Sequence, residues 1–214
     1  MRTFIALCFS VGTTRRIAEA MEQKAALLKD LGWKLAWVPP ANLHLTLSFL
    51  GSIPPESVDA IATRLRQRLV DLSPITLRAQ GAGSFPRSDE SSGGAAPRVL
   101  WIGVTSADQN KALFALQKSI AADMEDLGFP KADPGQAFFP HITIARVIEP
   151  APADQLAAWP AELATQDFGE DRITEVVVYE SLRHQTNYQT NYPTPKSHRL
   201  GAEYVARARV PFTK

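Results

Sequence analysis

The stretch HLTLSFLG, from His44 to Gly51, and its echo HITIAR, from His141 to Arg146, decide how this chain is expected to fold. In each stretch a histidine is followed two residues later by a threonine, and leucine or isoleucine occupies the alternate positions. Alternation with a period of two is typical of a half-buried β-strand, whose successive side chains point to opposite faces. We therefore predict a strand at each stretch, with its aliphatic face in a core.

The polar faces of these two strands carry the same pair of side chains. His44 and Thr46 project from one face of the first strand, and His141 and Thr143 project from one face of the second. The two histidines are separated by close to half the length of the chain. Brought side by side, the strands would place two imidazoles and two hydroxyls in one groove.

Composition limits the class of protein without naming its function. The chain has 214 residues, 45% of them hydrophobic, which is enough to bury a substantial core. Its 23 basic and 22 acidic residues leave a formal net charge of +1, so a polyanion would have to be held by a local cluster. Cys8, the single cysteine, cannot form an internal disulfide, and its apolar surroundings predict a buried thiol in a reducing compartment.

The N-terminal sequence MRTFIALCFSVG has a basic residue and a short apolar run, as a signal peptide would. The run alternates, however, and it leads directly into the charged segment TTRRIAEAMEQK, so we interpret it as a first strand. No stretch approaches the roughly 18 apolar residues that a membrane-spanning helix needs. We expect a cytoplasmic protein with no membrane partner.

The order of the expected elements looks like one unit used twice. We predict strands at residues 2–10, 44–51, 75–85, 98–106, 138–148, 173–181 and 203–212, and helices at residues 13–31, 54–72, 108–127 and 152–163. Thr13 or Thr14 is the expected cap of the first helix. We predict an α+β protein, a single domain over residues 1–214 with two similar lobes, in which two mainly antiparallel sheets with outer helices enclose a central cleft.

Two histidines in one groove suit general acid–base chemistry. Imidazole has an unperturbed pKa near 6.5, so it can donate or accept a proton at neutral pH. Hydrolysis of a cyclic phosphodiester needs both roles, because a base activates water while an acid protonates the departing ribose oxygen. His44 and His141 are therefore the candidate catalytic residues.

The threonines and one arginine suit a phosphate clamp. The hydroxyls of Thr46 and Thr143 can donate to non-bridging oxygens, and Arg146 can add a charge-assisted, bidentate contact. Strict alternation places Arg146 on the aliphatic face, so its role requires a strand end or a bulge at Ala145. Phe49 has the same difficulty, because alternation places it on the face of Leu45 and Leu47, and a core position is at least as well supported as a base-stacking one.

Other interpretations of these residues are less demanding. The pattern His-x-Thr occurs a third time at His184, but in a polar segment with nothing to anchor a strand, so we expect no catalytic role there. A zinc site would need three or four ligands, and the two histidine strands offer no Cys, Asp or Glu on the same faces, so we expect no metal or other cofactor. Arg64, Arg66 and Arg68 are most simply a solvated helix face.

The paired motifs and their flanks WVPPANLHLTLSFLG, PRVLWIGV and FFPHITIARV, with the opening RTFIAL, resemble the two-histidine phosphoesterases. The resemblance is to the bacterial and archaeal RNA 2′,3′-cyclic phosphodiesterases, long labelled 2′-5′ RNA ligases. It covers residues 2–181 and resumes near Tyr204. The Ser- and Gly-rich loop 86–97 and the connection 184–201 depart from the family pattern, and either could change how the rest of the RNA is held.

The resemblance implies a bilobal fold and metal-independent hydrolysis of a terminal 2′,3′-cyclic phosphate to a 2′-phosphomonoester. It implies that His44 donates a proton to the 3′ oxygen, that His141 accepts one from water, and that Thr46 and Thr143 grip the phosphate. The expected partner is an RNA 3′ end, tRNA fragments being one candidate, and the expected state is a monomer. Reverse 2′-5′ ligation would use the same groups. Two alternatives stay open: a phosphoesterase for a small cyclic phosphate such as that of ADP-ribose, and a non-catalytic RNA-binding module.

Overall fold

The computed structural model describes residues 1–86, 97–129, 137–150, 163–183 and 202–214. The loops expected at 86–97 and 184–201, the helix expected at 152–163, and both His184 and His198 lie outside these ranges, apart from residues 86, 97 and 163. Within the described ranges the elements are β1 (Arg2–Cys8), α1 (Val11–Asp30), β2 (Lys34–Trp37), the 3-10 turn η1 (Pro40–Asn42), β3 (His44–Ser52), α2 (Ser57–Leu69), β4 (Ile75–Pro86), β5 (Pro97–Thr105), α3 (Lys111–Asp126), β6 (His141–Glu149), β7 (Asp167–Ile173), β8 (Glu175–Arg183) and β9 (Ala202–Pro211).

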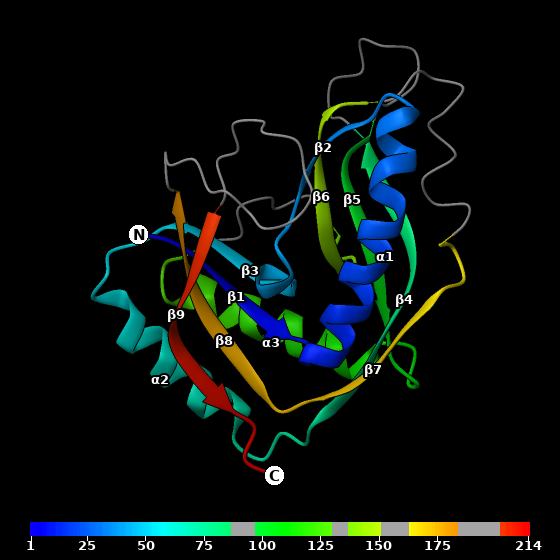
Figure 1. Cartoon of the computed structure of the whole chain (residues 1–214). Coiled ribbons are helices and arrows are strands. Elements are labelled where there is room, and N and C mark those ends of the chain that lie inside the picture. The colour runs from blue at the N-terminus through cyan, green and yellow to red at the C-terminus, as the bar shows by residue number, and fades with distance from the viewer. Residues whose placement is uncertain (87–96, 130–136, 151–162, 184–201) are drawn as a thin grey trace.

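In the described part of the chain the strands form one curled antiparallel sheet in the order β7-β4-β5-β6-β3-β1-β8-β9, and β2 pairs with β6 (Figure 1). The predicted α+β class, with antiparallel strands and outer helices, is confirmed. The structure also shows how the two predicted sheets meet: β3 and β6 pair at Leu45 and Ile142, each of which directly follows a histidine. The two strands that carry the repeated motif therefore lie at the centre of the sheet.

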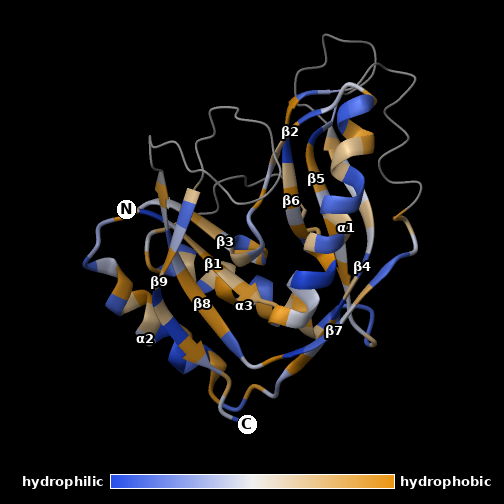
Figure 2. Ribbon diagram, in the orientation of Figure 1, coloured by the Kyte–Doolittle hydropathy of each residue, from blue (hydrophilic) through white to orange (hydrophobic). Residues whose placement is uncertain are grey.

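The helices cover the sheet on its outside. Helix α1 packs against β7 and η1, α2 packs against β9, and α3 packs against β3 and α2. Figure 2 shows β1 and β8 as mainly hydrophobic and β7 as largely hydrophilic, whereas each helix mixes hydrophobic and hydrophilic residues. Ile5, Leu45 and Ile142 are fully buried, and burial of one such side chain contributes about 1.5–3 kcal/mol. No helix in the described ranges has the length and apolar content to cross a membrane.

Two strands were not expected from the sequence. Strand β2 pairs with β6, and β7 pairs with β4 at one edge of the sheet. The sequence of β7, DFGEDRI, is mostly charged, but Phe168 and Ile173 are buried while the residues between them are partly or fully exposed. An edge strand tolerates charge because its outer side faces water.

Helix α1 begins earlier than expected. Its N-cap is Ser10, whose hydroxyl accepts a hydrogen bond from the backbone N–H of Thr13, so the prediction of a cap at Thr13 or Thr14 is wrong. Thr13 is fully buried instead, and its hydroxyl accepts a hydrogen bond from Arg16.

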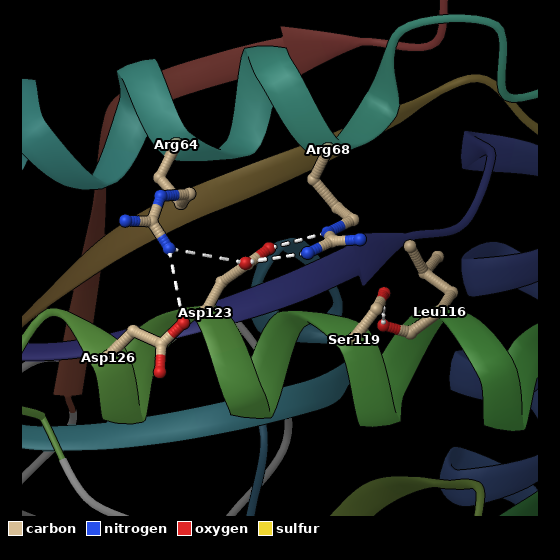
Figure 3. Close-up of polar contacts among 6 residues, drawn as sticks. All are labelled: Arg64, Arg68, Leu116, Ser119, Asp123 and Asp126. Atoms are coloured by element: carbon tan, nitrogen blue, oxygen red, sulfur yellow. Dashed lines mark hydrogen bonds and ion pairs between the residues drawn. The ribbon is translucent and has the colours of Figure 1, made fainter.

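The arginines of α2 are only in part a solvated face. Arg68 donates two hydrogen bonds to the carboxylate of Asp123 on α3, at 2.7 and 2.8 Å, and Arg64 contributes a longer contact at 3.4 Å (Figure 3). Asp123 is buried, and these hydrogen bonds hold its pKa below the usual range of a carboxyl group despite its burial. Arg66 is exposed, as expected. The pairs tie α2 to α3, and a single sequence could not reveal them because they form between helices.

Candidate active site

The two predicted histidines lie on adjacent strands at the centre of the sheet. Leu45 of β3 and Ile142 of β6 form an antiparallel pair and are fully buried. In such a pair the flanking residues point to the opposite face and lie across from each other. This places His44 nearest Thr143 and Thr46 nearest His141 on one face, and all four side chains are partly exposed there.

Both imidazole rings are held in the same tautomer by the backbone. The Nδ1 atom of His44 is 2.7 Å from the carbonyl oxygen of Asn42, and Nδ1 of His141 is 2.8 Å from the carbonyl oxygen of Phe139. Since a carbonyl only accepts, Nδ1 carries the proton in each ring, and Nε2 has the lone pair when the ring is neutral. In both cases the carbonyl belongs to the residue two positions before the histidine. Nε2 of His44 is 3.0 Å from the hydroxyl of Thr46, which can donate to it.

Aromatic side chains enclose His44. Phe4 of β1 stacks on its ring with centroids 4.7 Å apart, and Tyr204 of β9 meets it edge-on at 5.3 Å. Tyr179 of β8 stacks on Phe4, and its hydroxyl lies 3.1 Å from Sγ of Cys8. Cys8 is only partly buried, whereas the sequence predicted a buried thiol, and it lies beside the site.

A different aromatic group surrounds His141. Phe85 of β4 meets its ring edge-on at 4.9 Å, and Phe139 lies tilted to it at 6.3 Å. Trp101 of β5 packs against Phe139 at 4.9 Å. Phe139 keeps 46% of its surface exposed, so this group is more open than the one around His44.

Burial is the main influence on the titration of both rings. It lowers the pKa of His44 to about 4; the hydrogen bond to the Asn42 carbonyl opposes this shift, and the charge of His141 adds to it. Burial likewise lowers the pKa of His141, against the hydrogen bond to Phe139. The effect of His141 on His44 means that the two rings are close enough to interact electrostatically.

A bulge in β6 brings Arg146 to the face of the histidines. Trp101 pairs with Thr143, but Leu100 pairs with Ala145, so Ile144 is an extra residue in β6. Ile144 and Ala145 are consecutive buried residues, and the alternation is shifted by one from there on. Arg146 is exposed as a result. The alternation predicted from the sequence would have kept it on the aliphatic face.

A corresponding irregularity in β3 affects Phe49. Ile5 pairs with Ser48 and Ala6 pairs with Thr46, so Leu47 is the extra residue there. Phe49 is half-buried, with the guanidinium of Arg2 at 4.5 Å from its ring centroid, while Leu50 is buried. The expectation that Phe49 shares the face of Leu45 and Leu47 is therefore wrong.

Positive charge reaches the His44 side of the site from both halves of the sheet. Burial raises the pKa of the Tyr204 hydroxyl, and Arg146 and Arg2 oppose this shift. Tyr204, His44 and Asn42 also line a hollow of about 640 Å³. Among the described residues no three His, Cys, Asp or Glu side chains are grouped so that they could hold a metal ion.

The residues singled out from the sequence thus gather on one face, whereas three of their neighbours were missed. Phe4 and Tyr204 contact His44 from β1 and β9, and a single sequence does not reveal which strands will flank a histidine. Asn42 contacts it locally, from two residues earlier. The only available signal was that all three lie in or near segments expected to lead into or form strands.

Comparison with known proteins gives a consistent result. A family model described as "2′-5′ RNA ligase superfamily" matches residues 15–185. An RNA 2′,3′-cyclic phosphodiesterase of Thermotoga maritima is 32% identical over 147 residues, which cover 69% of this chain and 70% of that protein.

Solved structures share the fold. TT0787 of Thermus thermophilus superimposes with a TM-score of 0.72 at 23% identity, over 99% of this chain and 98% of that chain. E. coli LigT complexed with 3′-AMP superimposes with a TM-score of 0.68 at 21% identity, over 100% of this chain and 98% of that chain.

Proposed function

Since this chain belongs to the 2′-5′ RNA ligase superfamily, we propose that it is an RNA 2′,3′-cyclic phosphodiesterase, a hydrolase that opens the cyclic phosphate at an RNA 3′ end to a 2′-phosphomonoester. Curated relatives at 29–39% identity carry that name. The observation that carries the proposal is the matched pair of imidazoles. Nδ1 of each ring is bound to a carbonyl, and the two histidines directly precede Leu45 and Ile142, which pair with each other at the centre of the sheet.

In the proposed reaction the two rings act on one phosphorus atom. Nε2 of His141 accepts a proton from water as the water oxygen bonds to phosphorus. The bond between phosphorus and the 3′ oxygen breaks, and Nε2 of His44 gives its proton to that oxygen. The product carries a 2′-phosphate and a 3′-hydroxyl, and proton exchange with solvent restores both rings.

The lowered pKa of His44 places a condition on this assignment. At neutral pH the free protein holds His44 as a neutral ring, because its pKa is about 4, and a neutral ring with its Nδ1 proton bound to a carbonyl cannot protonate the leaving oxygen. A bound phosphodiester carries a negative charge, which favours the imidazolium form and raises the pKa. The substrate itself therefore brings the proton donor into its active state.

The remaining candidate residues would hold the phosphate. Thr46 and Thr143 face the histidines across the central strand pair, so each hydroxyl can donate to a non-bridging oxygen. Arg146, brought to this face by the bulge at Ile144, can add a charge-assisted contact. The clamp and the two imidazoles make up the proposed chemistry, in which no metal takes part. Ligation of a 5′-hydroxyl to the 2′ position is the reverse of the same steps and would use the same groups.

The direct test is an assay of an RNA that ends in a 2′,3′-cyclic phosphate, with the position of the product phosphate determined by NMR. We expect multiple turnovers, a 2′-phosphate, and the same rate in EDTA. A cyclic mononucleotide and an ADP-ribose cyclic phosphate serve as comparison substrates. Faster turnover of either would shift the function to a small nucleotide, and binding of RNA without turnover would leave a non-catalytic module.

A further inference from the structure

The polar contacts of Asn42 set the His44 side of the site apart from the His141 side. We propose that Asn42 is a positioning residue for His44: its side chain ties the η1 turn to strand β9 and thereby fixes the carbonyl that orients the imidazole. The proposal concerns the catalytic role of His44, so it rests on the proposed function, but its contacts can be tested without any substrate.

Asn42 makes two short hydrogen bonds in opposite directions. Its side-chain Nδ2 donates to the carbonyl oxygen of Ala202 on β9 at 2.7 Å, and its own carbonyl oxygen accepts from Nδ1 of His44 at 2.7 Å. The orientation of the amide is determined by chemistry, because the carbonyl of Ala202 accepts only from the nitrogen. One residue thus connects the histidine to a strand 160 positions away in the sequence.

The backbone around Asn42 has little freedom to compensate for a lost contact. Pro39 and Pro40 precede it, each with its φ fixed by the ring, and the N–H of Asn42 donates to the carbonyl of Pro39 at 2.8 Å. Leu43, which follows it, is buried. Three constraints therefore hold the Asn42 carbonyl: the turn after the prolines, the burial of Leu43 and the hydrogen bond to Ala202. Of these, only the hydrogen bond to Ala202 can be removed by substituting the side chain of Asn42.

Loss of that carbonyl contact would act on the chemistry of His44. The hydrogen bond from Nδ1 keeps Nε2 directed away from the carbonyl, near the hydroxyl of Thr46. It is also the influence that favours the protonated ring, against burial and the charge of His141. If the Asn42 carbonyl moved, Nε2 of His44 would point in a different direction and the pKa of the ring would fall further.

The second histidine offers an internal contrast. The carbonyl of Phe139 receives the equivalent hydrogen bond from His141, but a phenylalanine side chain has no group that could tie the turn to another strand by hydrogen bonding. Its ring packs edge-on against Phe85 at 5.7 Å. The polar connection is thus a property of the His44 side.

Charged and titratable groups near His44 must be kept constant in any test of its titration. His141 acts on it from β6; Cys8, Tyr179 and Tyr204 lie around it on β1, β8 and β9, and Arg2 and Arg146 act on Tyr204. Glu175 and Arg209 act on Cys8 and Tyr179. Substitution of Asn42 by an uncharged residue leaves all of these groups in place.

The experiment compares Asn42→Ala with the wild type and with Asn110→Ala. Asn110 donates from Nδ2 to the carbonyl of Val104 at 3.3 Å, so this control also removes an asparagine–carbonyl bond, but in the part of the sheet that holds His141. Histidine 15N NMR of the free proteins reports the tautomer and the pKa of His44. Steady-state kinetics on a cyclic-phosphate RNA report kcat and KM.

We expect Asn42→Ala to reduce the Nδ1-protonated tautomer of His44, to lower its pKa further, and to lower kcat by about 10- to 100-fold with KM nearly unchanged. Asn42→Gln, which keeps an amide donor, should recover part of the loss. Asn110→Ala should lower the melting temperature without moving the His44 signals.

Two results would overturn the proposal: an unchanged tautomer and kcat in Asn42→Ala, or the same change at His44 in Asn110→Ala. If the wild-type protein turned over no cyclic phosphate, the proposed function would fail, while the NMR comparison would still decide whether Asn42 positions the ring.

Discussion

The two halves of the sheet carry the same motif in different surroundings. His44 and His141 share the strand pattern, the tautomer and the carbonyl acceptor two residues earlier. His44, however, is enclosed by Phe4 and Tyr204, whereas His141 lies beside the half-exposed Phe139. The carbonyl two residues before each histidine therefore sets which ring nitrogen faces the site, whereas the neighbouring strands set how readily that nitrogen is protonated.

The hollows on the two sides differ in the same way. Next to His44, a hollow of about 640 Å³ is lined by polar groups such as Asp171, Arg172 and Arg209. In the other half, a hollow of about 400 Å³ adjoins the residue before His141 and is lined by Trp101 and Phe138. A cyclic phosphodiester also has two unlike sides, the departing oxygen and the attacking water. We expect the chemical roles of the two histidines to follow this asymmetry.

If both histidines take part in catalysis, neither can be removed without loss of activity. We expect His44→Ala and His141→Ala each to lower kcat by about 10²- to 10⁴-fold, because each removes one proton-transfer group. Circular dichroism should show an intact fold, since both rings lie on the partly exposed face. A variant that kept more than a tenth of wild-type turnover would remove its histidine from the mechanism.

The deeper burial of His44 can be tested through the dependence of stability on pH. The pKa of His44 is lowered from 6.5 to about 4. Above pH 6.5 His44 is neutral in both the folded and the unfolded protein, so its lowered pKa takes nothing from the free energy of unfolding. As the pH falls towards 4 the unfolded chain takes up a proton that the folded state does not, and the free energy of unfolding decreases by at most about 3 kcal/mol.

Denaturant unfolding at several pH values measures this loss. We expect His44→Gln to flatten the decrease between pH 6.5 and 4 more than His141→Gln does, because His141 is less deeply buried. Equal flattening by the two variants would remove the claimed difference between the sites.

The clamp can be probed at the bulge in β6. We expect Arg146→Ala to raise KM by about tenfold with a smaller change in kcat, because it removes a charge-assisted contact to a phosphate. Arg66→Ala, in which an exposed arginine of α2 is lost, is the matched control and should leave KM unchanged. An equal rise in KM for both would indicate general attraction for RNA.

The smallest effect is expected away from the face of the histidines. Arg68→Met removes two hydrogen bonds to Asp123 but leaves the Arg64 contact in place. The free energy of unfolding should fall by about 1 kcal/mol, while kcat and KM stay at wild-type values. A change in kcat would mean that α2 and α3 influence the site, and the two halves could not be compared independently.

The sequence predicted the residues of the central strands because their aliphatic faces alternate without interruption. Leu45 and Leu47, like Ile142 and Ile144, can be assigned to a core from spacing alone. The position of a bulge cannot be predicted in this way, because an extra residue such as Ile144 is defined by the pairing of β6 with β5 and not by the local spacing. For this reason strict alternation put Phe49 and Arg146 on the aliphatic face. The bulge that a role for Arg146 required was expected at Ala145 and is found one residue earlier, at Ile144.

The strands and contacts that escaped prediction share one cause. Strand β7 is an edge strand with charged residues, so its pairing with β4, and not its hydrophobicity, makes it a strand. Tyr204 lies beside His44 because β9 pairs with β8, which pairs with β1. The same pairing brings Ala202 to the side chain of Asn42. Contacts between residues far apart in the sequence depend on the register of the whole sheet.

A substrate with altered leaving-group chemistry tests the central claim most directly. When sulfur replaces the bridging 3′ oxygen, the departing thiolate needs no proton, because thiols have a pKa near 8.5. With this substrate His44→Ala is expected to regain most of its lost rate, whereas His141→Ala stays impaired. Rescue of His141→Ala, or the same loss in both variants on both substrates, would contradict the account of two imidazoles with distinct roles at one phosphorus atom.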